Sequence, residues 1–299
     1  MGRLQRGCMN LRRGMSPGGS LLVVFALTAL TLASATGAQA RTATGAPSCP
    51  SGGTPAPGST VTGGLEVDGI CSLEDVTVYG GISVDPSPES AGFNFNLVQL
   101  SGSTIFGGIV VGEGSVAGVG VDELAGQFTV PSTVNGGIRA NNALWVDSAY
   151  STIRGHVTGS FKSLSFLCGS PENGCLAASV WCGNVLYGNM TLESGPSILI
   201  LAGDPGEAFP AGQCPGNTIH GSVVLKDSNV VEPFSGEGFE FEGNNVTASV
   251  LVDHSTGEVY GNTVGGSLLC TNGTVIQPPA PGDPSGTTNA VRGADTCIN

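Results

Sequence analysis

The sequence predicts an all-β chain that winds into a single solenoid of about ten coils. Its 299 residues include 49 glycines, only 11% are charged, and scarcely any run favours a helix after the first forty residues. Glycine without a collagen period, mixed with Val, Ile, Leu and Thr, indicates short strands joined by tight turns. An eight-residue unit that recurs along most of the chain then locates the strands.

The first forty residues, 1–40, have the features of a secretory signal peptide. Four arginines precede an apolar run over residues 21–35, and a small-residue cleavage pattern follows at 38–40. The apolar run is too short to cross a bilayer comfortably as a helix. We therefore expect a mature chain that begins near Arg41, carries no membrane span, and is secreted, extracellular or associated with the cell wall.

Residues 41–59 are rich in Pro, Gly, Ser and Thr and show no periodicity. Such a composition is typical of a flexible leader. Strand structure is expected to start at Thr60, so that the solenoid domain covers residues 60–299.

The recurring unit is eight residues long, and its second position is always Val, Ile or Leu. The sixth position is apolar in all copies but the last, and the fourth and fifth are often glycine. The copies are TVTGGLEV at Thr60, TVYGGISV at Thr77, TIFGGIVV at Thr104, TVNGGIRA at Thr133, TIRGHVTG at Thr152, VLYGNMTL at Val185, TIHGSVVL at Thr218, NVTASVLV at Asn245, TVGGSLLC at Thr263 and AVRGADTC at Ala290.

This pattern describes two short strands separated by a glycine bend. Alternation at period two places positions two, six and eight on one face, which we expect to be the buried face. Successive copies start 17 residues apart (Thr60 to Thr77) at the closest and 33 apart (Thr152 to Val185) at the widest. A unit of variable length with a constant signature is typical of a solenoid coil, whereas the strands of a β-sandwich would not share one signature.

Eight cysteines follow the signal peptide, and an even number in a secreted chain predicts disulfides. Zinc sites are the weaker interpretation, because the chain has no CxxC pair and only three histidines. Stacking of successive coils pairs cysteines at equivalent positions. The predicted bridges are Cys270 with Cys297, Cys182 with Cys214, Cys168 with Cys175, and Cys49 with Cys71.

The recurring TVxGG units and the ending GNTVGGSLLCTNG, followed by a Pro-rich turn, NAVRG and Cys297, carry a family resemblance. The chain resembles uncharacterised actinobacterial secreted proteins of the right-handed parallel β-helix type. The similarity covers about residues 60–299 and implies a right-handed parallel β-helix, in agreement with the repeat. It implies no activity, and the chain departs from simpler members by long inserts after Val84, Gly159 and Leu192.

The charge balance excludes some partners. The formal net charge is −13, and loss of the four signal-peptide arginines makes the mature chain more acidic still. Such a chain repels nucleic acid and anionic lipid. No phosphate-loop motif, GxSxG nucleophile motif or calcium-binding nonapeptide is present, so no cofactor or metal is predicted.

Two weak groups of catalytic candidates remain. Arg139, Arg154 and His156 lie on neighbouring coils and are the best candidates for a polysaccharide lyase patch. Glu240 and Glu242 alternate with two phenylalanines, and could hold calcium or act as acid and base. The simpler interpretation of this pair is a solvated face opposite buried rings, and Asp122, Glu123, Asp147 and Asp253 are expected to be isolated.

Aromatic side chains at position three form the candidate ligand-binding residues. Tyr79 and Phe106 fall on adjacent coils, and Tyr187 and His220 form a second such pair. Flat rings along a solenoid can receive the faces of sugars, or they can simply stack on each other.

These observations predict a secreted or cell-surface β-helix protein with a structural, adhesive or glycan-binding role. Cell-surface or environmental polysaccharide is the expected partner, and no evident catalytic site supports enzyme activity. The alternative is a polysaccharide-active lyase or hydrolase of the pectin-lyase-like fold.

Overall fold

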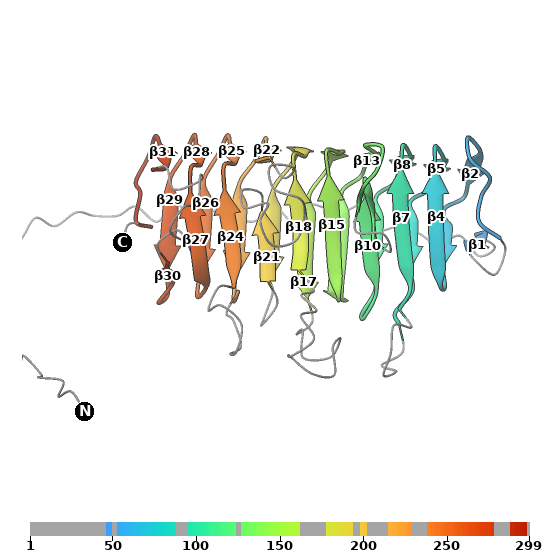
Figure 1. The fold of residues 1–299 in the computed structure, drawn as a ribbon, viewed down its shortest axis with the longest axis horizontal. Helices are drawn as coiled ribbons and strands as arrows, with labels where there is room; N and C mark the ends of the chain where they lie inside the picture. Colours follow the sequence, from blue (N-terminus) through green and yellow to red (C-terminus); the bar gives the residue numbers. More distant parts are fainter. Residues whose placement is uncertain are drawn as a thin grey trace, which may run out of the picture. The chain divides into compact units, whose positions relative to one another are not determined.

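The computed structural model describes residues 46–49, 53–87, 95–123, 127–161, 178–193, 198–201, 215–228, 238–277 and 288–297. All of them belong to one compact unit, Thr36–Asn299. The described residues contain no helix, and therefore none that could cross a membrane. They form three long parallel sheets, whose strands lie side by side in a row in Figure 1.

Sheet 1 has ten strands in the order β2-β5-β8-β13-β16-β19-β22-β25-β28-β31. Each begins at the first position of one copy of the eight-residue unit. The strands are β2 (Thr60–Thr62), β5 (Thr77–Tyr79), β8 (Thr104–Phe106), β13 (Thr133–Asn135), β16 (Thr152–Arg154), β19 (Val185–Tyr187), β22 (Thr218–Ile219), β25 (Asn245–Val246), β28 (Thr263–Val264) and β31 (Ala290–Val291).

Sheet 2 also has ten strands, and most of them come from the second half of the unit. In order they are β1 (Ser48–Cys49), β3 (Leu65–Val67), β6 (Ile82–Val84), β9 (Ile109–Val111), β14 (Ile138–Ala143), β17 (Val157–Phe161), β20 (Met190–Glu193), β23 (Val223–Lys226), β26 (Val250–Asp253) and β29 (Leu268–Thr271).

Sheet 3 has nine strands and comes from the segments between the units. Its strands are β4 (Ile70–Glu74), β7 (Leu97–Ser101), β10 (Val116–Val119), β15 (Trp145–Ala149), β18 (Ala178–Cys182), β21 (Ile198–Leu201), β24 (Phe239–Glu242), β27 (Thr256–Tyr260) and β30 (Val275–Ile276). A separate antiparallel pair joins β11 (Val121–Asp122) to β12 (Gln127–Phe128).

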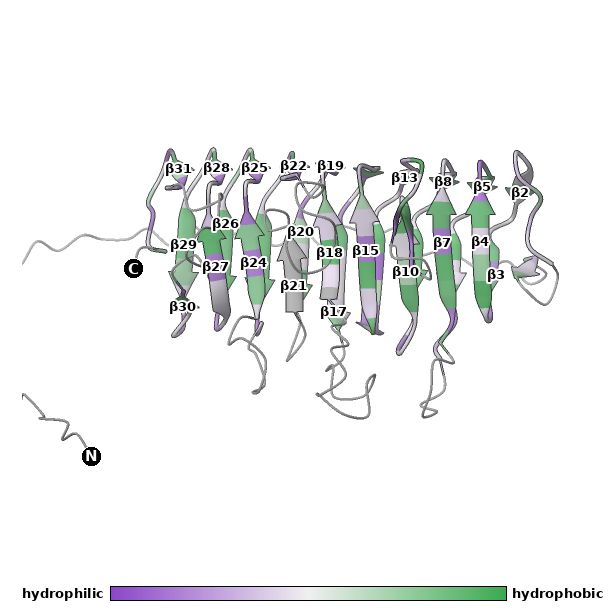
Figure 2. Cartoon of the chain, in the orientation of Figure 1, coloured by the Kyte–Doolittle hydropathy of each residue, from purple (hydrophilic) through white to green (hydrophobic). Residues whose placement is uncertain are grey.

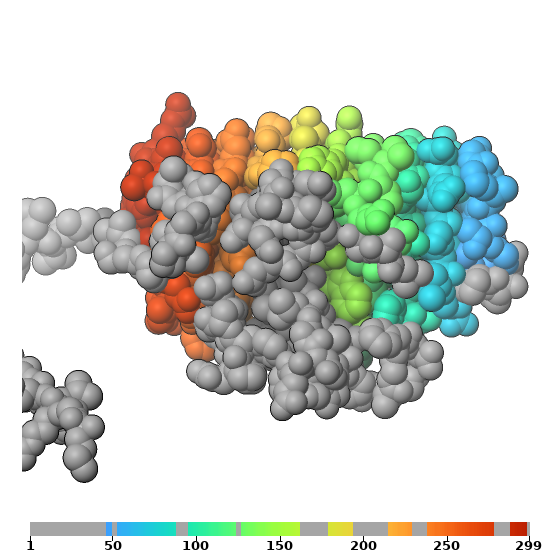
Figure 3. Space-filling model, in the orientation of Figure 1, coloured from blue at the N-terminus to red at the C-terminus, as the bar shows by residue number. Residues whose placement is uncertain are grey.

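Consecutive strands pass from sheet 1 to sheet 2 to sheet 3 and then return to sheet 1. Thus β2, β3 and β4 are followed by β5, which pairs in parallel with β2. This succession of parallel strands is consistent with a β-helix. The space-filling view in Figure 3 shows the same order, from the N-terminal segments at one end of the stack to the C-terminal segments at the other.

The pairing follows the predicted alignment of the repeats. Thr77 pairs with Thr104, Val78 with Ile105 and Tyr79 with Phe106, and this register continues along sheet 1. Positions two, six and eight are buried as predicted in most copies of the unit; in the second copy they are Val78, Ile82 and Val84. Figure 2 shows the resulting hydrophobic stretches along the strands.

The glycines at positions four and five form the turn between sheets 1 and 2. Gly81 has a φ of 84°, and a Cβ atom there would lie 2.9 Å from the carbonyl oxygens of Gly107 and Gly108. Side chains would therefore push neighbouring coils apart at this turn, which explains why the unit retains its glycines.

A ladder of polar side chains fills the opposite turn, between sheets 3 and 1. From β8 onward, the residue before each sheet 1 strand accepts, through its side-chain oxygen, the backbone N–H of the same position one coil earlier, at 2.9–3.2 Å. We call this the corner ladder. Its acceptors are Ser103, Ser132, Ser151, Asn184, Asn217, Asn244, Asn262 and Asn289.

The corner ladder satisfies backbone groups that the turns would otherwise leave buried without partners. The asparagines also donate through Nδ2 to carbonyls at the ends of sheet 3 strands, as Asn217 does to Trp181 O at 2.8 Å. Each coil is thus tied to its neighbours by a side chain in addition to its backbone ladders.

The N-terminal end of the stack includes part of the segment expected to be a leader. Ser48 and Cys49 form β1, which pairs with β3, and Cys49 is fully buried. Strand pairing therefore starts before Thr60, because the Cys49–Cys71 disulfide and the edge of β3 hold this segment.

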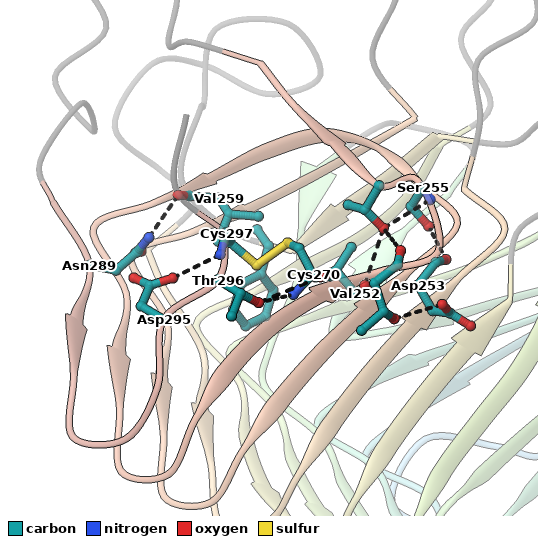
Figure 4. The surroundings of a disulfide bond; sticks show 12 residues. Val252, Asp253, Ser255, Val259, Cys270, Asn289, Asp295, Thr296 and Cys297 are labelled. Atoms are coloured by element: carbon teal, nitrogen blue, oxygen red, sulfur yellow. Dashed lines mark hydrogen bonds between the residues drawn. A yellow bond between two sulfur atoms is a disulfide. The ribbon is translucent and has the colours of Figure 1, made fainter. Parts of the chain in front are cut away.

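The C-terminal end is closed by the last residues of the chain, which Figure 4 shows in detail. The Cys270–Cys297 disulfide links β29 to this segment, and Thr296 Oγ1 accepts the backbone N–H of Cys270 at 2.9 Å. Leu268 N–H donates to Ala294 O, so the exposed edge of β29 is partly satisfied. Such capping protects the open end of a solenoid.

Both of these bridges are the predicted pairs. Cys182 is also disulfide-bonded. The predicted partner Cys214 and the predicted Cys168–Cys175 bridge lie outside the described residues.

Candidate functional site

The outer face of sheet 1 carries the ring residues predicted from position three. Because position two points into the core, positions one and three point outward on each strand. Position three forms one continuous line along the sheet, which we call the ring row. It consists of Thr62, Tyr79, Phe106, Asn135, Arg154, Tyr187, His220, Thr247, Gly265 and Arg292.

Tyr79 and Phe106 stack face to face on β5 and β8 and form an exposed aromatic platform. Their ring centroids lie 4.8 Å apart with an interplanar angle of 4°. The two residues retain 47% and 39% exposure, although large apolar rings are usually buried. The prediction that these rings stand side by side is confirmed.

A second stack lies further along the ring row, on β16, β19 and β22. Tyr187 and His220 stack with centroids 4.8 Å apart at 15°, and the guanidinium of Arg154 lies 5.6 Å from the Tyr187 centroid on its other side. All three side chains are exposed. The predicted neighbourhood of Tyr187 and His220 is therefore confirmed, and Arg154 extends it.

The outer face of sheet 1 also differs from the rest of this acidic chain in its charge. None of the residues at positions one and three of its ten strands is Asp or Glu. Within the described residues, neither Arg154 nor Arg292 forms an ion pair with a carboxylate. This face is thus neutral to cationic in a protein of net charge −13.

The ring row ends in a shallow trough of about 550 Å³ over β25, β28 and β31. Small residues make it: Thr247, Gly265 and Ala290 project little from the sheet. Arg292 lines the same trough at the last strand.

The outer face of sheet 3 holds a second candidate, which the sequence interpretation missed. Glu123, directly after β11, lies over β10, where Gly118 has no side chain; a Cβ at Gly118 would be 2.6 Å from Glu123 Oε1. Asp147 pairs with Gly118 from the next strand. The two carboxyl groups, expected to be isolated, therefore interact with each other.

Hydrogen bonds fix this carboxyl pair. Trp145 Nε1 donates to Glu123 Oε2 at 2.9 Å, and Val180 N–H donates to Asp147 Oδ1 at 2.8 Å. Glu123 Oε1 is buried, and no other described residue outside the carboxyl pair donates to it. The remaining oxygens are then best satisfied when the pair shares one proton.

Burial raises the pKa of both groups. The pKa of Glu123 lies well above its usual range because its carboxyl is buried and faces the charge of Asp147. Burial likewise raises the pKa of Asp147 to about 7, against the lowering effect of the Val180 N–H. A carboxyl–carboxylate pair of this kind can exchange a proton near neutral pH.

Glu240 and Glu242 lie on β24 on the same outer face, but they are not solvated. Glu240 is 9% exposed and Glu242 0%, so the interpretation as a solvated face is wrong. Glu240 pairs with Glu258 of β27, which is also buried. Figure 2 shows hydrophilic bands on β24, β27 and β15.

The predicted patch of Arg139, Arg154 and His156 is divided between two faces. Arg154 lies on sheet 1, while Arg139 lies on sheet 2 and bonds Asn141 Oδ1 through Nε. His156 lies in the turn between these sheets, where its Nδ1 accepts the backbone N–H of Asn189. Each of the three residues interacts with its own near neighbours, and the described residues form no cleft that all three share.

Asp253 is not isolated either, since Thr271 Oγ1 and Asn272 Nδ2 donate to it at 2.7 and 2.5 Å. Mainly the Thr271 hydrogen bond lowers the pKa of Asp253. In the part of the chain that the structure describes, no group of three or more His, Cys, Asp and Glu side chains could hold a metal ion.

Comparisons of the chain with models of protein families, with curated proteins and with solved structures found no match.

Proposed function

We propose that the protein is an extracellular, non-enzymatic β-helix that binds glycans through the outer face of sheet 1. In this proposal the helix is right-handed with about ten coils, follows a cleaved signal peptide, and acts as a structural or adhesive element. The observation that carries the proposal is the exposed, parallel face-to-face stack of Tyr79 and Phe106.

The stacked rings leave their edges and their two outer faces available to a ligand, and the apolar faces of pyranose rings can pack on such surfaces. Aromatic side chains contribute large contact areas with little loss of side-chain entropy. The strands beneath are fixed in register on both sides, so the platform is rigid before a ligand arrives. The regular strand spacing repeats similar contacts along an extended polymer, which suits a polysaccharide better than a small molecule.

The test is binding of the mature protein to a glycan array, followed by calorimetry with the best ligands. Replacing both rings, Tyr79→Ala with Phe106→Ala, is expected to weaken binding at least tenfold. Ile70→Ala is the control, because Ile70 is a similarly exposed apolar side chain on sheet 3. Unchanged affinity in the double variant would remove the platform from the proposal.

A second function is supported by the Glu123–Asp147 pair. Two carboxyl groups with separated protonation states can serve a glycosidase as acid and as base or nucleophile. This is the basis for the alternative, a polysaccharide lyase or hydrolase.

The alternative is tested by incubating the mature protein with acidic and neutral polysaccharides, with and without calcium. Release of reducing or unsaturated ends that disappears in Glu123→Gln and Asp147→Asn would establish the enzyme. The absence of such products from the whole panel is expected under the first proposal.

A further inference from the structure

We infer that the sheet 1 face prefers acidic heteropolysaccharides in which carboxylated sugars alternate with neutral ones. This inference rests on the proposed glycan-binding function and names the class of ligand. It is carried by the positions of Arg154 and Arg292 relative to the rings and the trough.

The first step concerns charge. Both guanidinium groups are exposed and have no carboxylate partner among the described residues, although acidic side chains are more than twice as numerous as basic ones in the chain. An unpaired Arg is suited to bidentate recognition of a ligand carboxylate. Positions one and three of the sheet 1 strands carry no carboxylate that would compete with the ligand for these guanidinium groups.

The second step concerns adjacency. Arg154 continues directly into the Tyr187–His220 stack, so a sugar lying on these rings places a substituent near the guanidinium. On the far side of His220, the trough over β25, β28 and β31 accommodates further sugar units and ends at Arg292. A ligand lying along sheet 1 would therefore contact Arg154 first, then the Tyr187–His220 stack and the trough, and finally Arg292.

The third step concerns spacing. Five strand intervals separate β16 from β31, which corresponds to about 24 Å at the usual distance between paired strands. The ring-row positions between the two arginines include no Asp, Glu, Lys or Arg. A polymer with a negative charge on every unit would find only two guanidinium groups on this row, so most of its charges would have no positive partner. The net charge of −13 of the protein would also repel such a polymer. The same argument disfavours single-stranded nucleic acid, despite its ability to stack on rings.

The experiment compares dissociation constants for four probes at low and moderate salt. The probes are hyaluronan oligosaccharides, which alternate carboxylated and neutral sugars, fully charged polygalacturonate oligosaccharides, neutral glucan oligosaccharides, and oligo-dT. We expect hyaluronan oligosaccharides to bind at least tenfold more tightly than the others at low salt. This advantage should shrink as salt increases, because the two contacts are exposed.

Matched variants assign the preference to the two arginines. Arg154→Gln with Arg292→Gln should abolish the advantage of the acidic probe over neutral glucan. Lys226→Gln, which removes a positive charge from sheet 2, should leave the preference intact. A preference that survives in the arginine double variant would overturn the inference.

The outcomes also separate this inference from the proposed function. Neutral and acidic probes binding equally, with both depending on Tyr79 and Phe106, would overturn the charge preference and retain glycan binding. Binding of none of the sugars would overturn both. Tighter binding of polygalacturonate or oligo-dT than of hyaluronan would overturn the sparse-charge argument.

Discussion

The outer faces of sheets 1 and 3 are built by the same coils, yet they carry opposite polar chemistry. Sheet 1 exposes stacked rings and two arginines and has no carboxylate at its outward positions. Sheet 3 instead holds Asp147, Glu240 and Glu258 in largely buried positions. Polar groups that are buried must find partners inside the protein, whereas exposed ones remain available to a ligand. The comparison predicts that substitutions on sheet 3 change stability and those on sheet 1 change binding.

The largest effect is expected at Gly118, beneath Glu123. In Gly118→Ala the new Cβ would lie 2.6 Å from Glu123 Oε1 and 2.8 Å from Val121 O, a backbone atom held by the β11–β12 pair. Displacement of Glu123 and strain in β10 should lower the free energy of unfolding by about 1–3 kcal/mol. Chemical denaturation measures this loss, with Ser83→Ala on the outer face of sheet 2 as the control. A variant as stable as the parent would show that Glu123 is not confined there.

The next effect concerns pH and the Glu123–Asp147 pair. The folded pKa values of both groups lie above their unfolded values near 4. The folded state therefore binds more protons than the unfolded state between about pH 4 and pH 7, and this pair's contribution to stability falls as the pH rises through that range.

Glu123→Gln should reduce this loss, since an amide can donate to Asp147 and accept from Trp145 without a shared proton. We expect the variant to be more stable than the parent at pH 8, by on the order of 1–2 kcal/mol, with little gain at pH 4. Thermal unfolding midpoints measured from pH 4 to pH 8 give the pH dependence of stability for the parent and for the variant. Parallel curves for the two proteins would contradict the shared proton.

A smaller effect on stability is expected from the exposed rings of sheet 1. Tyr79→Ala with Phe106→Ala removes an aromatic contact worth about 0.5–1.5 kcal/mol, which should leave the fold intact. The same variant is expected to lose at least tenfold in glycan affinity. A large fall in the unfolding midpoint would assign the rings to the fold and weaken the distinction between the two faces.

The smallest effect is expected at Arg154, which is exposed and contacts only the Tyr187 ring among the described contacts. Arg154→Gln should lower stability by about 0.5–1 kcal/mol at most. Its thermal midpoint should lie close to that of the parent, whereas affinity for an acidic glycan should fall measurably at low salt. Equal affinity at low salt would show that this cation does not contact the ligand.

The repeat unit was sufficient to predict sheets 1 and 2, because its apolar positions and its glycines each have one structural role. Tyr79 and Phe106 were predictable as neighbours for the same reason, since equal positions in successive copies are paired. Glu123 and Asp147 were not predictable as a pair. Glu123 follows the β11 segment outside any copy of the unit, and only the missing side chain of Gly118 makes room for it.

Burial of Glu240 and Glu242 was also beyond the sequence pattern. Alternation identifies the outer face of β24 correctly, but alternation reports only which side of a sheet a residue occupies, and a solenoid face can be covered by other parts of the chain. The corner ladder, in contrast, has a recognisable signal in the sequence. Ser or Asn precedes nearly every sheet 1 strand, as in Ser103, Ser151, Asn217 and Asn262.

The corner ladder changes from serine to asparagine between Ser151 and Asn184, yet the hydrogen bond across that junction has the same length as its neighbours on either side. Serine and asparagine thus form equivalent hydrogen bonds to the backbone of the adjoining coil. Coils can consequently be duplicated, deleted or exchanged in evolution and in engineering, provided that each returns to the corner with one oxygen-bearing side chain. The number of coils, and with it the length of the outer face of sheet 1, is then adjustable without redesign of the core.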